Sequence, residues 1–156
     1  YDQTLRYGIS QVEAVSQIKK FNESGCVGFI PAFRDSVEYV TKLSELGWKF
    51  EVISCLDRDK YAQKLRRKNL VHLFGDVFDF IDCALDFTVG KEKYLFDRYK
   101  GKRYYWIEDT VSHAESGLKV GLNSIVMDHP YNKEWNGPRV KNWKQIYQTL
   151  NNDTTS

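Results

Sequence analysis

The stretch YYWIEDTVSHAESGLKVGLNSIVMD, residues 104–128, decides the fold class, because it predicts a strand, a helix and a second strand in close succession. Its aromatic start predicts a buried strand, and the spacing of Ser112 and Glu115 predicts a capping box at the start of the helix. Gly121 predicts the end of that helix, and NSIVMD at 123–128 predicts the next strand. Two strands joined by one helix indicate parallel pairing through a right-handed crossover.

The same alternation continues outside this stretch. Apolar residues at helical spacing predict a helix over 36–46, and WKFEVISC at 48–55 predicts a strand. The remaining segments predict a helix over 57–68, a strand near 84–89, a helix over 91–100 and a final helix over 140–150. We therefore expect an α/β fold with a doubly wound parallel sheet covered by helices.

Length and composition predict one compact domain with a small addition. The chain has 156 residues, of which 42% are hydrophobic, and this is enough for one sizeable core. We expect a small helical cap region over about 1–30, an α/β core over 31–150 and a disordered polar tail over 151–156.

Charge and cysteine usage exclude several classes of protein. The 23 basic and 21 acidic residues leave a net charge of +2, which is not the footprint of a nucleic-acid-binding protein, and the basic run at 64–69 is typical of a solvated helix end. Cys26, Cys55 and Cys83 lack metal-ligand spacing and predict a reducing, cytoplasmic setting. No apolar run reaches the roughly 18 residues of a membrane span. We expect neither a nucleic-acid polymer nor a membrane as a partner.

Polar residues that could form a ligand site follow the predicted strands. Ser54 ends one strand, Lys91 and Lys93 follow another, and Glu108 and Asp109 end the strand of the opening stretch. The carboxyl ends of parallel strands meet at one edge of a sheet, so we expect these side chains there. A hydroxyl and an ammonium group can hold phosphoryl oxygens, while carboxylates bind the Mg²⁺ that offsets the charge of a transferring phosphoryl group. The sequence therefore predicts a phosphate and magnesium site.

The order of these residues resembles that of the haloacid dehalogenase-like (HAD) phosphohydrolase superfamily. FEVIS, with Ser54, resembles the second motif of that superfamily, and Lys93 or Lys91 matches the lysine of the third. WIED, with Asp109, resembles the fourth motif, an acidic pair that ends a strand. Over residues 28–150 the chain is most similar to the 5'(3')-deoxyribonucleotidase group, including a PYN loop after the last strand. The resemblance implies a Rossmann-like core with a small helical cap.

The resemblance also implies a function. It implies a Mg²⁺-dependent phosphomonoesterase, a 5'-nucleotidase that hydrolyses (deoxy)nucleoside monophosphates through an aspartyl-phosphate intermediate. Asp109 would contact Mg²⁺, and Glu108 would bind through water or hold the loop. Ser54 would donate to a phosphoryl oxygen. Lys93, with Lys91 as the alternative, would compensate the charge of the nucleophile and the phosphate.

The first motif of the superfamily, a DxD that supplies the nucleophile, is not found in this sequence. DFID at 79–82 has the wrong spacing, and Asp2 follows no hydrophobic strand. Because a sheet without its central strand would leave unpaired edges in the core, we expect this strand and its DxD to precede Tyr1 in the full-length protein. The alternative is a non-catalytic relative that keeps the fold as a binding or assembly module.

Overall fold

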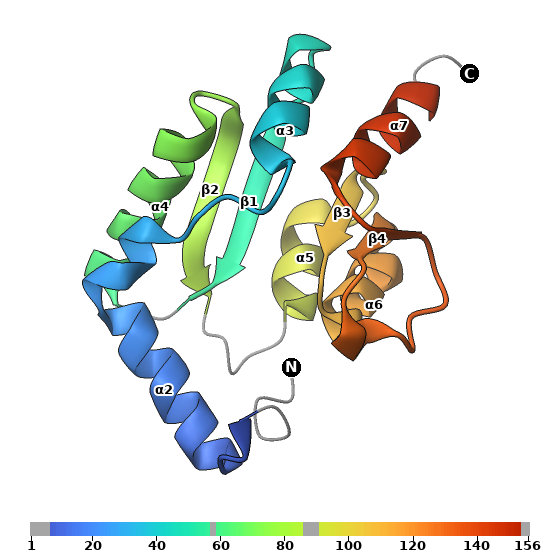
Figure 1. The fold of residues 1–156 in the computed structure, drawn as a ribbon. Coiled ribbons are helices and arrows are strands. Elements are labelled where there is room, and N and C mark those ends of the chain that lie inside the picture. The colour runs from blue at the N-terminus through green and yellow to red at the C-terminus, as the bar shows by residue number, and fades with distance from the viewer. Residues whose placement is uncertain (1–6, 57–58, 86–90, 154–156) are drawn as a thin grey trace. The chain divides into compact units, whose positions relative to one another are not determined.

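A computed structural model describes residues 7–56, 59–85 and 91–153 of the chain (Figure 1). The described residues form two compact units, an N-terminal unit within 7–85 and a C-terminal unit over 91–153. Each unit contains its own parallel sheet.

The N-terminal unit contains helices and a two-stranded parallel sheet. Along the chain its described elements are α2 (Gln11–Glu23), the 3₁₀ helix η1 (Gly25–Phe29), α3 (Ser36–Glu45), β1 (Phe50–Cys55), α4 (Lys60–Phe74) and β2 (Phe78–Leu85). The buried residues Leu70 of α4 and Ile81 and Cys83 of β2 form one core cluster. The helix that connects the two strands therefore covers one face of their sheet, as expected for a parallel crossover.

The predicted cap region, residues 1–30, contains α2 and η1 in its described part. A capping box at Ser10 begins α2. Val27 of η1 is fully buried and packs with Leu56, which follows β1, and with Ala62 of α4. η1 therefore shares a core cluster with α4. The boundary that the sequence places near residue 30, between a cap and the core, stays a prediction.

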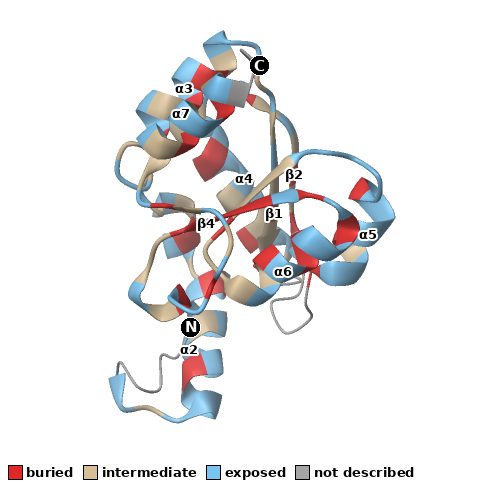
Figure 2. Ribbon diagram, turned by 90° about the vertical axis from the view of Figure 1, so that its right-hand side faces the viewer, coloured by how far each residue is buried: buried red, intermediate tan, exposed pale blue. Residues whose placement is uncertain are grey.

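The C-terminal unit is built around a three-stranded parallel sheet in the order β3-β4-β5. Its described elements are α5 (Glu92–Tyr99), β3 (Tyr105–Glu108), α6 (Val111–Val120), β4 (Asn123–Met127), the 3₁₀ helix η2 (Pro130–Asn132), β5 (Arg139–Val140) and α7 (Trp143–Asp153). All residues of β4 after the first are buried, as the colour of this strand in Figure 2 shows. Ala114 of α6 and Val126 of β4 pack with Trp135 in one cluster, so β4 is the centre of this unit.

The opening stretch folds into the predicted strand, helix and strand. β3 pairs with β4 in parallel, from Tyr105 opposite Asn123 to Glu108 opposite Val126. Gly121 follows α6 with a φ of 93°, a left-handed conformation that glycine adopts readily and that commonly ends a helix. Both the parallel pairing and the end of the helix are therefore confirmed.

The predicted capping box of this helix is wrong. α6 begins at Val111 with Thr110 as the N-cap residue, and the Thr110 side chain makes no capping hydrogen bond. Ser112 lies inside the helix, where its carbonyl accepts a hydrogen bond from Ser116 Oγ at 2.9 Å. Because β3 ends at Glu108 and the chain turns into the helix within two residues, Ser112 has already passed the N-cap position.

The strand expected near 84–89 begins earlier in the chain than predicted. β2 spans Phe78–Leu85, where Ile81 and Cys83 are buried on one face at the two-residue spacing of a strand. Pairing with β1 decides this position, because it provides the backbone partner that the sequence pattern alone does not identify. Residues 86–90 lie outside the described part of the chain.

Residues 151–153, which the sequence assigned to a disordered polar tail, are helical. α7 continues to Asp153, three residues beyond Leu150. Ile146 and Leu150 are buried one helical turn apart, so packing of this face supports the helix up to its polar end. Residues 154–156 lie outside the described part of the chain.

The structure is a mixed α/β protein with small parallel sheets. Over the described residues, β1 and β2 form one sheet and β3, β4 and β5 form another. A single doubly wound sheet stays a prediction. None of the helices in the described ranges is both long enough and apolar enough to cross a membrane.

Replacing Gly117 with alanine should destabilise the C-terminal unit. A Cβ atom on Gly117 would lie 2.5 Å from Trp106 Cδ1 of β3 and 2.6 Å from Ser124 Oγ of β4. Alanine favours a helix by about 1 kcal/mol, but overpacking costs about 1–3 kcal/mol, so we expect the free energy of unfolding to fall. Urea denaturation measures this change, with Glu115→Ala on the exposed face of α6 as the control. Equal stability of Gly117→Ala and the wild type would contradict this packing.

Candidate functional site

Strand β3 ends between the two adjacent carboxylates of the opening stretch. Glu108 is the last residue of β3, and Asp109 begins the turn into α6. Because side chains alternate along a strand, Trp106 and Glu108 point to the same face. Asp109 lies beyond the end of the strand, so this alternation does not determine the direction of its side chain. The two carboxylates therefore have different surroundings.

Glu108 forms a buried ion pair with Lys91. Lys91 Nζ donates a hydrogen bond to Glu108 Oε1, and both side chains are less than one-tenth exposed. Lys91 is the N-cap residue of α5, and its ammonium lies 5.1 Å from the centre of the Trp106 ring. Since Trp106 and Glu108 share a strand face, the ring and the carboxylate contact the same ammonium group.

His113 is the second residue that faces the Glu108 carboxylate. Its Nδ1 lies 3.7 Å from Glu108 Oε2, and its carbonyl accepts a hydrogen bond from Trp106 Nε1 at 3.1 Å. The sequence assigned no role to His113. The signal that could have found it is its position in the first turn of the helix that directly follows the acidic pair.

The charge of Glu108 is stabilised by these neighbours. Burial alone would raise the pKa of the Glu108 carboxyl, but His113 and Lys91 outweigh burial, so the pKa lies below its ordinary value. The backbone N–H of Asp109 also donates to Glu108 Oε2 at 3.3 Å. Glu108 is therefore a charged group that is compensated within the C-terminal unit.

This lowered pKa predicts how stability depends on pH. A carboxyl with a depressed pKa in the folded state stabilises the fold above its unfolded pKa, close to 4.5, and loses this contribution as the pH falls through the folded pKa. We therefore expect the difference in unfolding free energy between the wild type and Glu108→Gln to shrink between pH 7 and pH values below 4.5. Urea denaturation across this range measures it, with exposed Glu115→Gln as the control. A difference that stays constant with pH would contradict the prediction.

Asp109 is partly buried and receives hydrogen bonds from neutral donors. Tyr131 Oη donates to Asp109 Oδ2 at 2.7 Å, and Thr110 Oγ1 donates to Oδ1 at 3.3 Å. These donors orient the carboxylate but add no positive charge beside it. Sequence reasoning missed Tyr131. The available signal was its place after β4, because loops that follow adjacent parallel strands lie next to each other.

Asn132 connects the loop after β4 to the loop after β3. It is fully buried, and its Nδ2 donates to the carbonyls of Asp109 and Met127 at 2.8 Å each. Its Oδ1 accepts hydrogen bonds from the His129 N–H at 3.0 Å and from Arg139 Nη1 at 2.8 Å. Asn132 therefore holds the two loops together.

Removing the Asn132 side chain should destabilise the loops that hold Asp109. Asn132→Ala leaves two carbonyls and an N–H group of the loops without this partner, and a single buried polar group without its partner costs about 1–3 kcal/mol. We expect a loss of at least that size in the free energy of unfolding. Urea denaturation measures it, and Asn136→Ala, at an exposed position of the same loop, is the matched control. Equal effects of the two substitutions would contradict the prediction.

Asp128 is an acidic residue at the end of β4 with cationic partners. Lys133 Nζ lies 2.6 Å and Arg139 Nη1 lies 2.9 Å from Asp128 Oδ1. The hydrogen bond from Lys133 holds the pKa of Asp128 below its usual value, and Arg139 acts in the same direction. Since Arg139 also binds Asn132, Asp128 belongs to the framework of this loop.

The structure distinguishes the two candidate lysines. Lys91 faces Glu108, whereas Lys93 lies two residues later on α5 and is exposed. Ser54 is the next-to-last residue of β1 and is partly buried within the N-terminal unit. The structure therefore brings Lys91, Glu108 and Asp109 together in the C-terminal unit.

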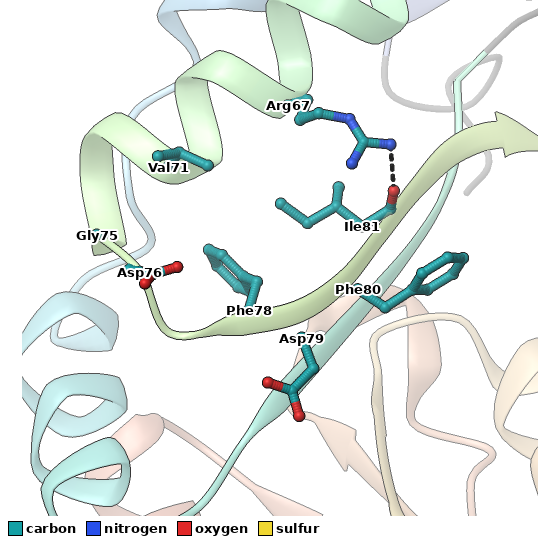
Figure 3. A pocket seen from close by; sticks show the side chains of 8 residues that line it. All are labelled: Arg67, Val71, Gly75, Asp76, Phe78, Asp79, Phe80 and Ile81. Atoms are coloured by element: carbon teal, nitrogen blue, oxygen red, sulfur yellow. Dashed lines mark hydrogen bonds between the residues drawn. The ribbon is translucent and has the colours of Figure 1, made fainter.

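A shallow pocket of the N-terminal unit lies between α4 and β2 (Figure 3). Val71 of α4 and Phe78 of β2 line it, and Arg67 donates a hydrogen bond to the carbonyl of Ile81 beside it. Phe78 pairs with the first residue of β1, so this pocket lies at the amino-terminal end of the strands. Ser54 lies at the opposite end of β1, and the pocket is separate from it.

The acidic pair at the end of β3 offers one carboxylate that suits a metal ion. In the part of the chain that the structure describes, no group of three or more His, Cys, Asp or Glu side chains is arranged to hold a metal. Mg²⁺ takes oxygen ligands and commonly uses one or two protein carboxylates together with water and phosphate oxygens. Asp109, with its neutral donors, fits one such ligand. Glu108 fits poorly as a direct ligand, because the ammonium group of Lys91 beside its Oε1 opposes the binding of a second cation.

Comparison of the chain with protein-family models, with curated proteins and with solved structures finds no match. The structure itself defines the class of the protein as mixed α/β. The resemblance to HAD phosphohydrolases stays a prediction. The geometry of Glu108 and Asp109 is therefore the main structural support for the function proposed below.

Proposed function

We propose that the protein is a Mg²⁺-dependent phosphomonoesterase of the HAD type, a 5'-nucleotidase that acts on (deoxy)nucleoside monophosphates. The observation that supports this most is the contrast between the two adjacent carboxylates at the end of β3. Lys91 compensates Glu108, whereas the donors to Asp109 are neutral. A carboxylate oriented without a cationic donor, at the carboxyl end of a parallel strand, is suited to a divalent cation beside a phosphate.

Each candidate residue has a role in this proposal. Asp109 supplies a carboxylate to Mg²⁺, and bound Mg²⁺ offsets the charge of the phosphoryl group. Lys91 is favoured over Lys93 because its ammonium contacts Glu108, the first residue of the acidic pair. Glu108 holds that ammonium beside the site. The role of Ser54 as a donor to a phosphoryl oxygen, like the doubly wound HAD core, is supported by the motif resemblance alone.

The nucleophile of the proposed reaction is an aspartate on a DxD strand, as the motif resemblance implies. Its carboxylate would attack phosphorus, the bond from phosphorus to the nucleoside oxygen would break, and that oxygen would take a proton from the second aspartate of the DxD, acting as the general acid. Water would then hydrolyse the aspartyl phosphate to inorganic phosphate. The motif resemblance supports a nucleotide as the proposed substrate, and cysteine usage supports a cytoplasmic location as part of the proposal.

Release of inorganic phosphate from deoxynucleoside 5'-monophosphates by the full-length protein tests the proposal. We expect turnover in Mg²⁺ and none after EDTA is added, with the nucleoside as the second product. Hydrolysis of p-nitrophenyl phosphate, but of no deoxynucleoside or ribonucleoside monophosphate, would overturn the substrate class. Failure to hydrolyse any of these phosphomonoesters would overturn the enzymatic function.

A non-catalytic HAD-like binding or assembly module is the second candidate. The observation that favours it is the ion pair of Lys91 and Glu108, which is complete without a ligand and would serve a purely structural purpose equally well. The coding sequence before Tyr1 distinguishes the two candidates. A hydrophobic strand that ends in DxD favours the enzyme, and its absence favours the module.

A further inference from the structure

Tyr131 contacts the carboxylate that the proposed function assigns to Mg²⁺. We propose that Tyr131 is a positioning residue, whose hydroxyl fixes the orientation of the Asp109 carboxylate so that its remaining lone pairs are available to a divalent cation. This inference rests on the proposed function and adds to it a residue to which the motif resemblance assigned no role.

The hydrogen bond between Tyr131 and Asp109 is short, and it leaves lone pairs of the carboxylate that a cation could use. Tyr131 Oη lies 2.7 Å from Asp109 Oδ2, close to the length of a hydrogen bond from a hydroxyl to a carboxylate. Thr110 Oγ1 donates to Oδ1 at 3.3 Å. A carboxylate offers about four lone-pair positions, so two donors leave positions for metal coordination.

The Tyr131 hydroxyl is held in place from two sides. The ring of Tyr131 stacks on the ring of His129, with 5.0 Å between the ring centres and 6° between the planes. The next residue, Asn132, is buried and anchors the backbone to the carbonyls of Asp109 and Met127. Because the ring and the backbone are both fixed, the hydroxyl needs little reorganisation to hold the carboxylate.

The chemistry of the donor distinguishes Asp109 from its neighbour. Glu108 has Lys91 as its donor, and a cationic donor opposes the binding of a second cation. A tyrosine hydroxyl orients a carboxylate without adding positive charge, so the attraction between Asp109 and a divalent cation is retained. This contrast is the physical reason for a tyrosine at this position.

Mg²⁺ binding to the full-length protein, measured by isothermal titration calorimetry, tests the inference. Tyr131→Phe keeps the ring that stacks on His129 and removes only the hydroxyl, and we expect it to weaken Mg²⁺ binding by about three- to tenfold. Asp109→Asn should remove binding. Tyr104→Phe, at an exposed position just before β3, is the matched control and should bind Mg²⁺ like the wild type. Thermal melting establishes that each variant is folded at the temperature of the titration.

The outcomes separate this inference from the proposed function. If Tyr131→Phe binds Mg²⁺ as tightly as the wild type while Asp109→Asn does not bind it, the role of Tyr131 is overturned and the metal site stands. Equal weakening by Tyr104→Phe also overturns the role of Tyr131. If the wild type binds no Mg²⁺, the metal site and the inference both fail. In the phosphate-release assay, Tyr131→Phe should raise the Mg²⁺ concentration for half-maximal rate more than it lowers the rate at saturating Mg²⁺.

Discussion

We expect the substitution Asp109→Asn to lower the rate of phosphate release by at least about 10²-fold. The substitution keeps the size of the side chain and an oxygen that can accept the hydrogen bond from Tyr131. It removes the negative charge, so the attraction to a divalent cation is lost. Phosphate release by the full-length protein from deoxynucleoside monophosphates, measured at saturating Mg²⁺, gives the loss.

Asp97→Asn is the matched control for this experiment. Asp97 is an exposed aspartate on α5 in the same unit, and its substitution removes the same charge from the surface. We expect activity and circular dichroism of this variant to equal those of the wild type. Turnover by Asp109→Asn at the wild-type rate would show that Asp109 does not bind the metal, whatever the substrate.

Lys91→Met should destabilise the protein strongly, whereas Lys93→Met should not. Lys91 is paired with Glu108, and both side chains are almost fully buried. Removing one partner of a buried ion pair leaves an unpaired buried charge and costs about 3–5 kcal/mol. Lys93 is exposed on α5, and substitutions at such positions usually change stability by less than about 0.5 kcal/mol. Urea denaturation of both variants measures the difference.

The double variant Lys91→Met/Glu108→Gln tests whether the loss comes from the ion pair. Because the glutamine carries no charge, the methionine no longer leaves a charge without a partner, and the double variant should recover a large part of the stability. Additive losses from Lys91→Met and Glu108→Gln would show that the two residues act independently. They would contradict the ion pair as the source of the effect.

The order of strands and helices was predictable because it depends on local patterns. The apolar residues around 104–107 and 123–128 mark two strands, and Gly121 ends the helix between them. The capping box was mispredicted because Ser112 and Glu115 have the right spacing, yet the position of the N-cap depends on where the preceding strand ends. The start of the helix therefore could not be placed without knowing where the paired strand ends.

The candidate site was predictable in part. The acidic pair could be found because strand ends in parallel sheets gather polar residues. The choice between Lys91 and Lys93 could not be made from the sequence, because two residues on a helix differ by about 200° in direction, and only the start of α5 decides which one faces Glu108. His113 likewise emerged only from contacts in space.

The sequence by itself determined that the chain alternates strands and helices and that two adjacent carboxylates lie where one strand ends, because both are properties of neighbouring residues. Tertiary structure alone decided that these carboxylates differ. Glu108 lies on the strand face that meets Lys91, while Asp109 lies past the end of the strand and meets Tyr131 from the loop after β4. The physical reason is that the charge partner of a side chain depends on which distant segment packs against it, and the order of residues along the chain does not specify that segment.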